Sequence, residues 1–66
     1  MKTYFRTIEQ AIKHTEQLIN VSKWEVGTGF LEKMVAMDES GNRICAVYKT
    51  YNNSMKESFY SSIDNN

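Results

Sequence analysis

The first third of the chain has apolar residues at the spacing of a helix. They recur every three or four positions and would form a single stripe along one helical face. Directly before the stripe, Thr7 is followed three residues later by Gln10, the pattern of a capping box, in which a hydroxyl accepts from a backbone amide. The pattern predicts a helix over about residues 7–20, whose stripe contains Ile8, Ala11, Ile12, Thr15 and Ile19.

From residue 30 onward the pattern changes to the two-residue period of strands. Asp38-Glu39-Ser40-Gly41 suits a type I turn with Gly41 at a left-handed bulge position, and Asn52-Asn53 suits a second tight turn. Residues 30–37, 43–51 and 54–60 are therefore predicted strands, and residues 2–5 and 24–26 are shorter candidates. We expect an α+β fold with one amphipathic helix packed on a three- to four-stranded antiparallel sheet, in the order β-α-β-β-β or α-β-β-β.

The turns also predict how the strands pair, and the pairing determines which side chains share a face. A bulge at Gly41 places Ala36 opposite Ile44 and Glu32 opposite Tyr48. A two-residue Asn-Asn turn places Tyr48 opposite Glu57. The helix would then cover the face that contains Phe30, Met34, Ala36, Ile44, Ala46, Tyr48, Met55 and Phe59.

The other face of this predicted sheet is apolar in its centre and carries four cations without a carboxylate. Tyrosine, methionine and arginine are enriched at protein interfaces, and cations would steer an acidic partner. Lysines that only shield an exposed sheet would give the same pattern, so both interpretations remain open. The predicted partner-binding residues are Lys33, Val35, Met37, Arg43, Val47, Lys49, Tyr51, Lys56 and Tyr60.

Size and composition limit the functions that such a chain can have. Its 66 residues predict a single domain over residues 1–60 with a polar, frayed tail over 61–66. The 8 basic and 8 acidic side chains cancel, which argues against general binding to nucleic acid. Neither a signal peptide nor an apolar span is present, and Cys45 has no second cysteine to pair with. We therefore expect a cytoplasmic protein that does not bind a membrane.

Residues for chemistry are scarce. His14 and Cys45 are the only members of their types, so neither a zinc site nor a metal or organic cofactor is predicted. We expect His14 to be a partly exposed helix residue and Cys45 a small buried apolar one. Trp24 fits two roles, the end of the helix–sheet core or an anchor in an interface.

These observations favour a small non-enzymatic module that binds an acidic protein surface. An inhibitor of the phage or mobile-element type, which occludes a larger host protein, is one form of this hypothesis. The alternatives are a single-stranded nucleic-acid-binding protein that uses the same face, and a homodimeric structural or accessory protein.

Overall fold

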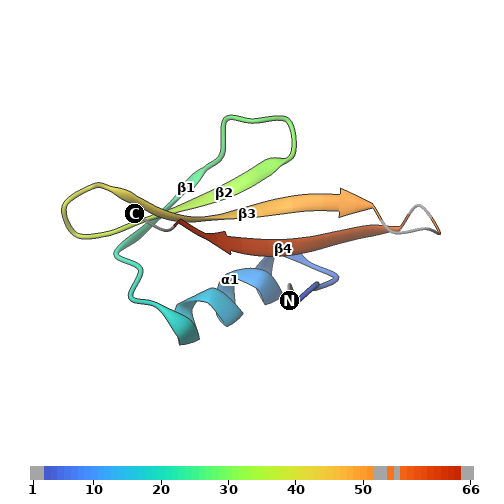
Figure 1. Cartoon of the computed structure of the whole chain (residues 1–66), viewed down its shortest axis with the longest axis horizontal. Helices are drawn as coiled ribbons and strands as arrows, with labels where there is room; N and C mark the ends of the chain where they lie inside the picture. Colours follow the sequence, from blue (N-terminus) through green and yellow to red (C-terminus); the bar gives the residue numbers. More distant parts are fainter. Residues whose placement is uncertain (1–2, 52–53, 55, 65–66) are drawn as a thin grey trace.

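The sheet and helix of this chain are arranged in two layers (Figure 1). The structure is a computed structural model that describes residues 3–51, 54 and 56–64. Its elements are α1 (Ile8–Leu18), β1 (Lys23–Val26), β2 (Glu32–Met37), β3 (Arg43–Tyr51) and β4 (Glu57–Ile63). The strands form one antiparallel sheet in the order β1-β2-β3-β4, and α1 packs on one face of it. The predicted α+β fold is confirmed, with the Trp24 segment as a fourth strand.

Helix α1 begins where the capping pattern predicts. The Thr7 hydroxyl accepts a hydrogen bond from the Gln10 amide at 3.2 Å. The Gln10 side chain in turn accepts from the amide of Arg6, one residue before the cap, at 3.1 Å. The helix faces the sheet with Ala11 and Thr15, both fully buried, and the Thr15 hydroxyl donates to the Ala11 carbonyl at 2.8 Å. The one buried polar side chain on this face is therefore satisfied.

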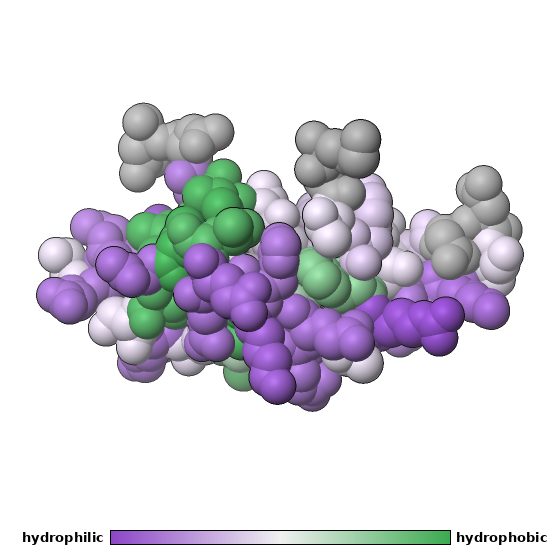
Figure 2. Space-filling view, turned by 90° about the horizontal axis from the view of Figure 1, so that it is seen from below, coloured by the Kyte–Doolittle hydropathy of each residue, from purple (hydrophilic) through white to green (hydrophobic). Residues whose placement is uncertain are grey.

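The core lies between α1 and strands β3 and β4. Ala11, Val47 and Phe59 form its buried centre. Partly buried apolar side chains pack around this centre; they are Phe5, Ile8, Ile12, Trp24 and Met34. Figure 2 views the molecule from the α1 side and shows apolar side chains gathered near the C-terminal half of the helix. The core is small, as expected for 66 residues.

The described part of the N-terminal segment pairs with the sheet through one β-bridge. Phe5 bridges Phe59 through a pair of backbone hydrogen bonds of 2.7 and 2.8 Å. The predicted first strand is thus a single bridge on the outer edge of β4, and residue 2 lies outside the described residues.

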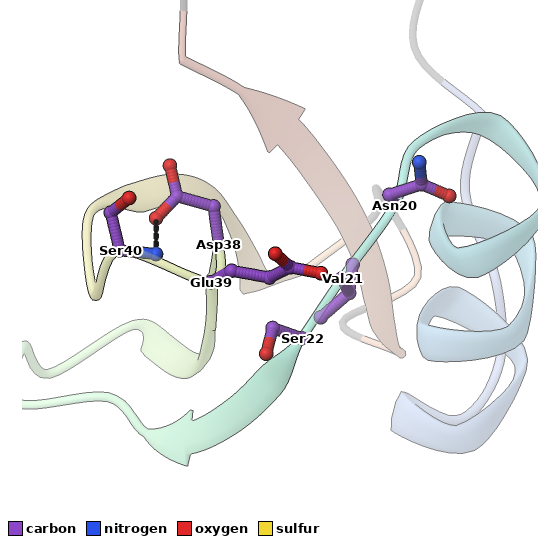
Figure 3. Close-up of a pocket in the computed structure, with 6 residues that line it drawn as sticks. All are labelled: Asn20, Val21, Ser22, Asp38, Glu39 and Ser40. Carbon is purple, nitrogen blue, oxygen red and sulfur yellow. Dashed lines mark hydrogen bonds between the residues drawn. The ribbon is translucent and has the colours of Figure 1, made fainter.

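The first predicted turn is confirmed in detail. The Gly41 amide donates to the Asp38 carbonyl at 3.0 Å, and Gly41 has a φ of 82°, in the left-handed region that favours glycine. The Asp38 carboxylate accepts from the amides of Ser40 and Asn42, both at 2.9 Å; Figure 3 shows the Ser40 bond. Local turn chemistry therefore determines this connection.

The predicted pairing of β2 with β3 is right at both ends and wrong in the middle. Glu32 lies opposite Tyr48 as predicted, but Ala36 lies opposite Cys45 rather than Ile44. The register shifts by one residue between Glu32 and Met34 and shifts back between Ala36 and Met37. These shifts leave Lys33 as an extra residue on β2 and Ile44 as one on β3. A slip of one residue reverses which side chains of a strand face the core.

The predicted pairing of β3 with β4 is wrong because the connection between them is longer than two residues. Tyr48 lies opposite Tyr60 rather than Glu57, and Tyr51 lies opposite Glu57. Strand β4 runs from Glu57 to Ile63, so residues 61–63 belong to the sheet and not to the tail. Residues 52 and 53, on which the second turn was predicted, lie outside the described residues.

These shifts exchange several predicted positions. Val47 and Cys45 face α1, whereas Ala46 and Tyr48 lie on the opposite face. Phe30 lies before β2 and is 81% exposed, so its predicted place in the core is wrong. Cys45 is buried and His14 is partly exposed, as predicted.

Candidate functional site: the uncovered face of the sheet

The face of the sheet opposite α1, here called the uncovered face, has a row of tyrosine rings. No described helix lies over it. Tyr48 and Tyr60 lie on directly opposed positions of β3 and β4, with ring centroids 5.5 Å apart and an interplanar angle of 26°. Tyr4 continues the row, with its ring edge toward Tyr60 and centroids 5.6 Å apart. Three aromatic rings thus extend side by side across the sheet.

The sequence places these rings through strand alternation and through the Phe5 bridge. Because Phe5 pairs with Phe59 and both face the core, their neighbours Tyr4 and Tyr60 point to the other side. Opposed aromatic residues on neighbouring strands stabilise a sheet by about 0.2–1 kcal/mol per pair. Tyr4 is nevertheless 55% exposed, so much of its ring surface is available to another molecule.

Arg43 is held at one end of the row by three side chains. Its Nη1 donates to Glu32 at 2.8 Å, its Nε to Asp64 at 3.0 Å, and its Nη2 to the Tyr48 hydroxyl at 2.9 Å. The side chain therefore extends from the start of β3 to Tyr48, past Ala46, which is fully buried although it lies on the uncovered face. The hydrogen bond to Tyr48 raises the pKa of Arg43, and Glu32 and Asp64 add to this against a partial loss of solvation.

The network leaves little net charge on this face. Arg43 is paired with two carboxylates, and Lys23 lies 3.5 Å from Glu25 on β1. Lys49, which lies on the side of α1, is also paired: its Nζ lies 2.7 Å from Glu57, whose hydrogen bond raises the pKa of the lysine. The predicted surface with four uncompensated cations is not formed, because Arg43 and Lys49 are paired with carboxylates and Lys49 lies on the other face.

The predicted partner-binding residues divide between the two faces. Val35, Met37, Arg43 and Tyr60 lie on the uncovered face. Val47, Lys49 and Tyr51 lie on the side of α1, and Val47 is fully buried in the core, so its predicted exposure is wrong. Lys33 is the extra residue on β2, and Lys56 directly precedes β4.

Sequence reasoning missed two tyrosines of the row and two acids of the network. The predicted pairing places Tyr48 on the face covered by the helix, and it does not include Tyr4, because no partner strand is predicted for residues 2–5. Glu32 and Asp64 accept hydrogen bonds from Arg43, although they are separated from it by 11 and 21 positions in the sequence. The available signal is the pair of aromatic dipeptides Tyr4-Phe5 and Phe59-Tyr60. If these two segments pair, alternation turns both phenylalanines toward the core and brings Tyr4 next to Tyr60 on the other face.

A shallow recess adjoins the row. It has a volume of about 350 Å³ and is lined by Tyr4, Thr50, Tyr51 and Ser58. Its hydroxyl groups can donate and accept hydrogen bonds, which suits a polar side chain or a backbone group of a partner.

A larger cleft of about 740 Å³ lies between the α1–β1 linker and the β2–β3 turn (Figure 3). Its lining is polar: Asn20, Ser22, Asp38, Glu39 and Ser40, with Val21. The Asp38 carboxylate is already engaged by the turn amides. This cleft therefore offers an open polar groove rather than a set of groups aimed at one point.

His14 lies on α1, and Cys45 faces α1 from β3. The His14 ring packs against Phe5 with centroids 5.0 Å apart, and burial raises the pKa of the Cys45 thiol. Within residues 3–51, 54 and 56–64, no three His, Cys, Asp or Glu side chains come together as metal ligands would.

Trp24 joins β1 to the helix. Its indole Nε1 donates to the Glu16 carboxylate at 3.0 Å, and the ring packs against the core cluster. This position fits the predicted role at the end of the core, although the ring stays partly exposed.

In the described part of the chain, no helix has the length and apolar character needed to cross a membrane. Comparison of the sequence with models of protein families and with curated proteins, and of the fold with solved structures, gave no match.

Proposed function

We propose that this chain is a small non-enzymatic module that binds another protein through the uncovered face of its sheet. The observation that carries the proposal is the row of Tyr4, Tyr60 and Tyr48 on a face without a covering helix. Tyrosine is favoured at interfaces because its ring buries apolar area while its hydroxyl remains hydrogen-bonded. The ring contacts hold the three side chains in place, which lowers the entropy lost on binding.

Charge favours a protein partner over a nucleic acid. A strand of nucleic acid is bound by aromatic stacking together with uncompensated cations along its phosphates. On the uncovered face Arg43 is already paired with Glu32 and Asp64. The partner should therefore have a largely uncharged contact surface, and the module would act by occupying that surface on a larger protein.

The partner can be identified and the face tested with one set of variants. A photo-crosslinking amino acid at position 4 should capture the partner in cells, whereas the same group at Gln17, exposed on α1, should not. With the captured protein purified, calorimetry should give a dissociation constant that rises roughly tenfold or more for Tyr4→Ser. Gln17→Ser is the matched control and should bind as the unmodified chain does.

Three results would contradict the proposal. Capture from position 17 but not from position 4 would place the interface on α1. Equal affinity of Tyr4→Ser and the unmodified chain would remove the tyrosine row from the interface. Tight, salt-dependent binding of oligothymidylate in fluorescence anisotropy would instead favour the nucleic-acid alternative.

A further inference from the structure

The two outer edges of the sheet differ. The edge of β4 is bridged by Phe5 through two backbone hydrogen bonds. Within the part of the chain that the structure describes, nothing pairs with the outer edge of β1. An open strand edge presents unpaired backbone groups that can bind another strand.

The backbone direction at β1 can be derived from one hydrogen bond. The Gly27 amide donates to the Lys33 carbonyl at 3.0 Å, on the side of β2. Because antiparallel strands alternate, Glu25 also directs its backbone groups toward β2, and the N–H and C=O groups of Trp24 and Val26 point outward. These two residues would make the hydrogen bonds to a strand added at the edge.

The side chains of β1 separate by chemistry between its two sides. Trp24 and Val26 share the α1 side, where Val26 is 79% exposed beside the half-buried indole. Lys23 and Glu25 share the other side, 3.5 Å apart and with side chains 67% and 49% exposed. The edge thus presents an apolar pair on one side and a pair of opposite charges on the other.

We propose that the outer edge of β1 binds the same edge of a second copy of this chain, antiparallel and centred on Trp24. The two Trp24 residues then exchange their outward backbone hydrogen bonds. Lys23 lies opposite the partner's Glu25, and Glu25 lies opposite the partner's Lys23. Such non-hydrogen-bonded positions bring Cα atoms to about 4.5 Å, close enough for both ion pairs to form.

Charge selects this register. Moving the centre by one residue places Glu25 opposite the partner's Glu25, or Lys23 opposite the partner's Lys23, and like charges directly opposite are unfavourable. In the proposed register Val26 also becomes the diagonal neighbour of the partner's Trp24, within reach of an aromatic ring. This contact gives the most exposed residue of β1 an apolar neighbour. The inference is independent of the tyrosine row and does not require the proposed function.

The charges of Lys23 and Glu25 allow the proposed dimer to be tested by charge reversal. Light scattering coupled to size exclusion, from micromolar to about millimolar chain, should show a concentration-dependent dimer, since a short edge contact is weak. Lys23→Glu alone and Glu25→Lys alone each place like charges opposite one another and should raise the dissociation constant roughly tenfold or more. The double variant restores both ion pairs and should dimerise, and an equimolar mixture of the two single variants should form the mixed dimer.

A second measurement locates the contact. As concentration rises, hydrogen exchange of the Trp24 and Val26 amides should slow, while that of the inward Glu25 amide should not change. Lys13→Glu, an exposed change of equal charge on α1, should leave dimerisation unaffected. A monomer throughout the concentration range would overturn the proposal. So would dimerisation of Glu25→Lys equal to that of the unmodified chain, or a mixture of single variants that stays monomeric.

Discussion

The two faces of the sheet are built from the same strands but are stabilised in different ways. On the side of α1, Val47 and Phe59 pack against Ala11, with 0–8% of each side chain exposed to water. On the uncovered face, ring contacts and the Arg43 network connect side chains that remain partly solvated. Burial of apolar area contributes about 25 cal/mol per Å², whereas exposed ion pairs contribute about 0–1 kcal/mol each. The covered face therefore supplies most of the stability, and the uncovered face can serve recognition.

The strongest test of this contrast places the same carboxylate on each face. Val47→Asp puts a charge into the core without a partner, at a cost of about 3–5 kcal/mol, which equals the whole stability expected for so small a core. Ser58→Asp puts it on the uncovered face and should cost less than about 1 kcal/mol. Circular dichroism with urea titration should show an unfolded Val47→Asp chain and a folded Ser58→Asp chain.

The reverse outcome would have a clear meaning. A folded Val47→Asp chain with native circular dichroism would place Val47 on the exposed side and reverse the two faces. Val47→Ala supplies a milder comparison, since it removes apolar contacts without adding charge and should leave the chain folded but less stable.

The second test breaks the polar network of the uncovered face. Arg43→Met removes the partner of Glu32, whose side chain is only 13% exposed, and should lower the free energy of unfolding by about 1 kcal/mol. Asp64→Asn keeps the Glu32 pair and should cost less, because the Asp64 side chain is 31% exposed. Urea unfolding at low and high salt measures both effects.

Lys23→Met is the matched control for this test, since the Lys23 side chain is 67% exposed. Its effect should stay within about 0.5 kcal/mol. An effect of Arg43→Met no larger than that of the control would mean that the network does not stabilise the sheet.

The parts of the fold that local chemistry determines were predictable. Thr7 and Gln10 mark the start of α1, and Asp38 and Gly41 set the first turn; each signal lies within four residues of what it determines. The middle of the β2–β3 pairing was not predictable. One bulge on each strand shifts the register by one residue and then back, so the length of the connecting turn is the same as without them. A bulge re-aims the side chains that follow it, and here the extra residue Ile44 turns Val47 toward α1.

The candidate site was predictable only in part for the same reason. Tyr60 and Arg43 were correctly assigned to the face away from the helix, but Val47 and Tyr48 were exchanged between faces. The compensation of Arg43 by Glu32 and Asp64 depends on three segments that meet only in the folded chain. Counting charges along strands therefore overestimated how basic the surface is.

The smallest expected effect comes from the Cys45 thiol, a titrating group that is buried on the covered face. Burial raises the pKa of the Cys45 thiol above its ordinary value of 9.0, although a hydrogen bond with Thr15 opposes the shift. Above about pH 9 the unfolded chain releases this proton while the folded chain retains it. The unfolded state then binds fewer protons, so the contribution of Cys45 to stability is complete below about pH 8 and falls as the pH rises through 9.0.

The effect can be isolated by a difference between variants. The other titrating side chains are common to the unmodified chain and Cys45→Ala, so their contributions cancel when the two are subtracted. The stability of the unmodified chain relative to Cys45→Ala should be constant from pH 7 to about 8 and then decline by at most about 1.4 kcal/mol per pH unit. Ser58→Ala, on the uncovered face, should show no such decline. A relative stability of Cys45→Ala that does not change with pH would mean that the thiol is solvated, and hence that α1 does not shield this part of the sheet.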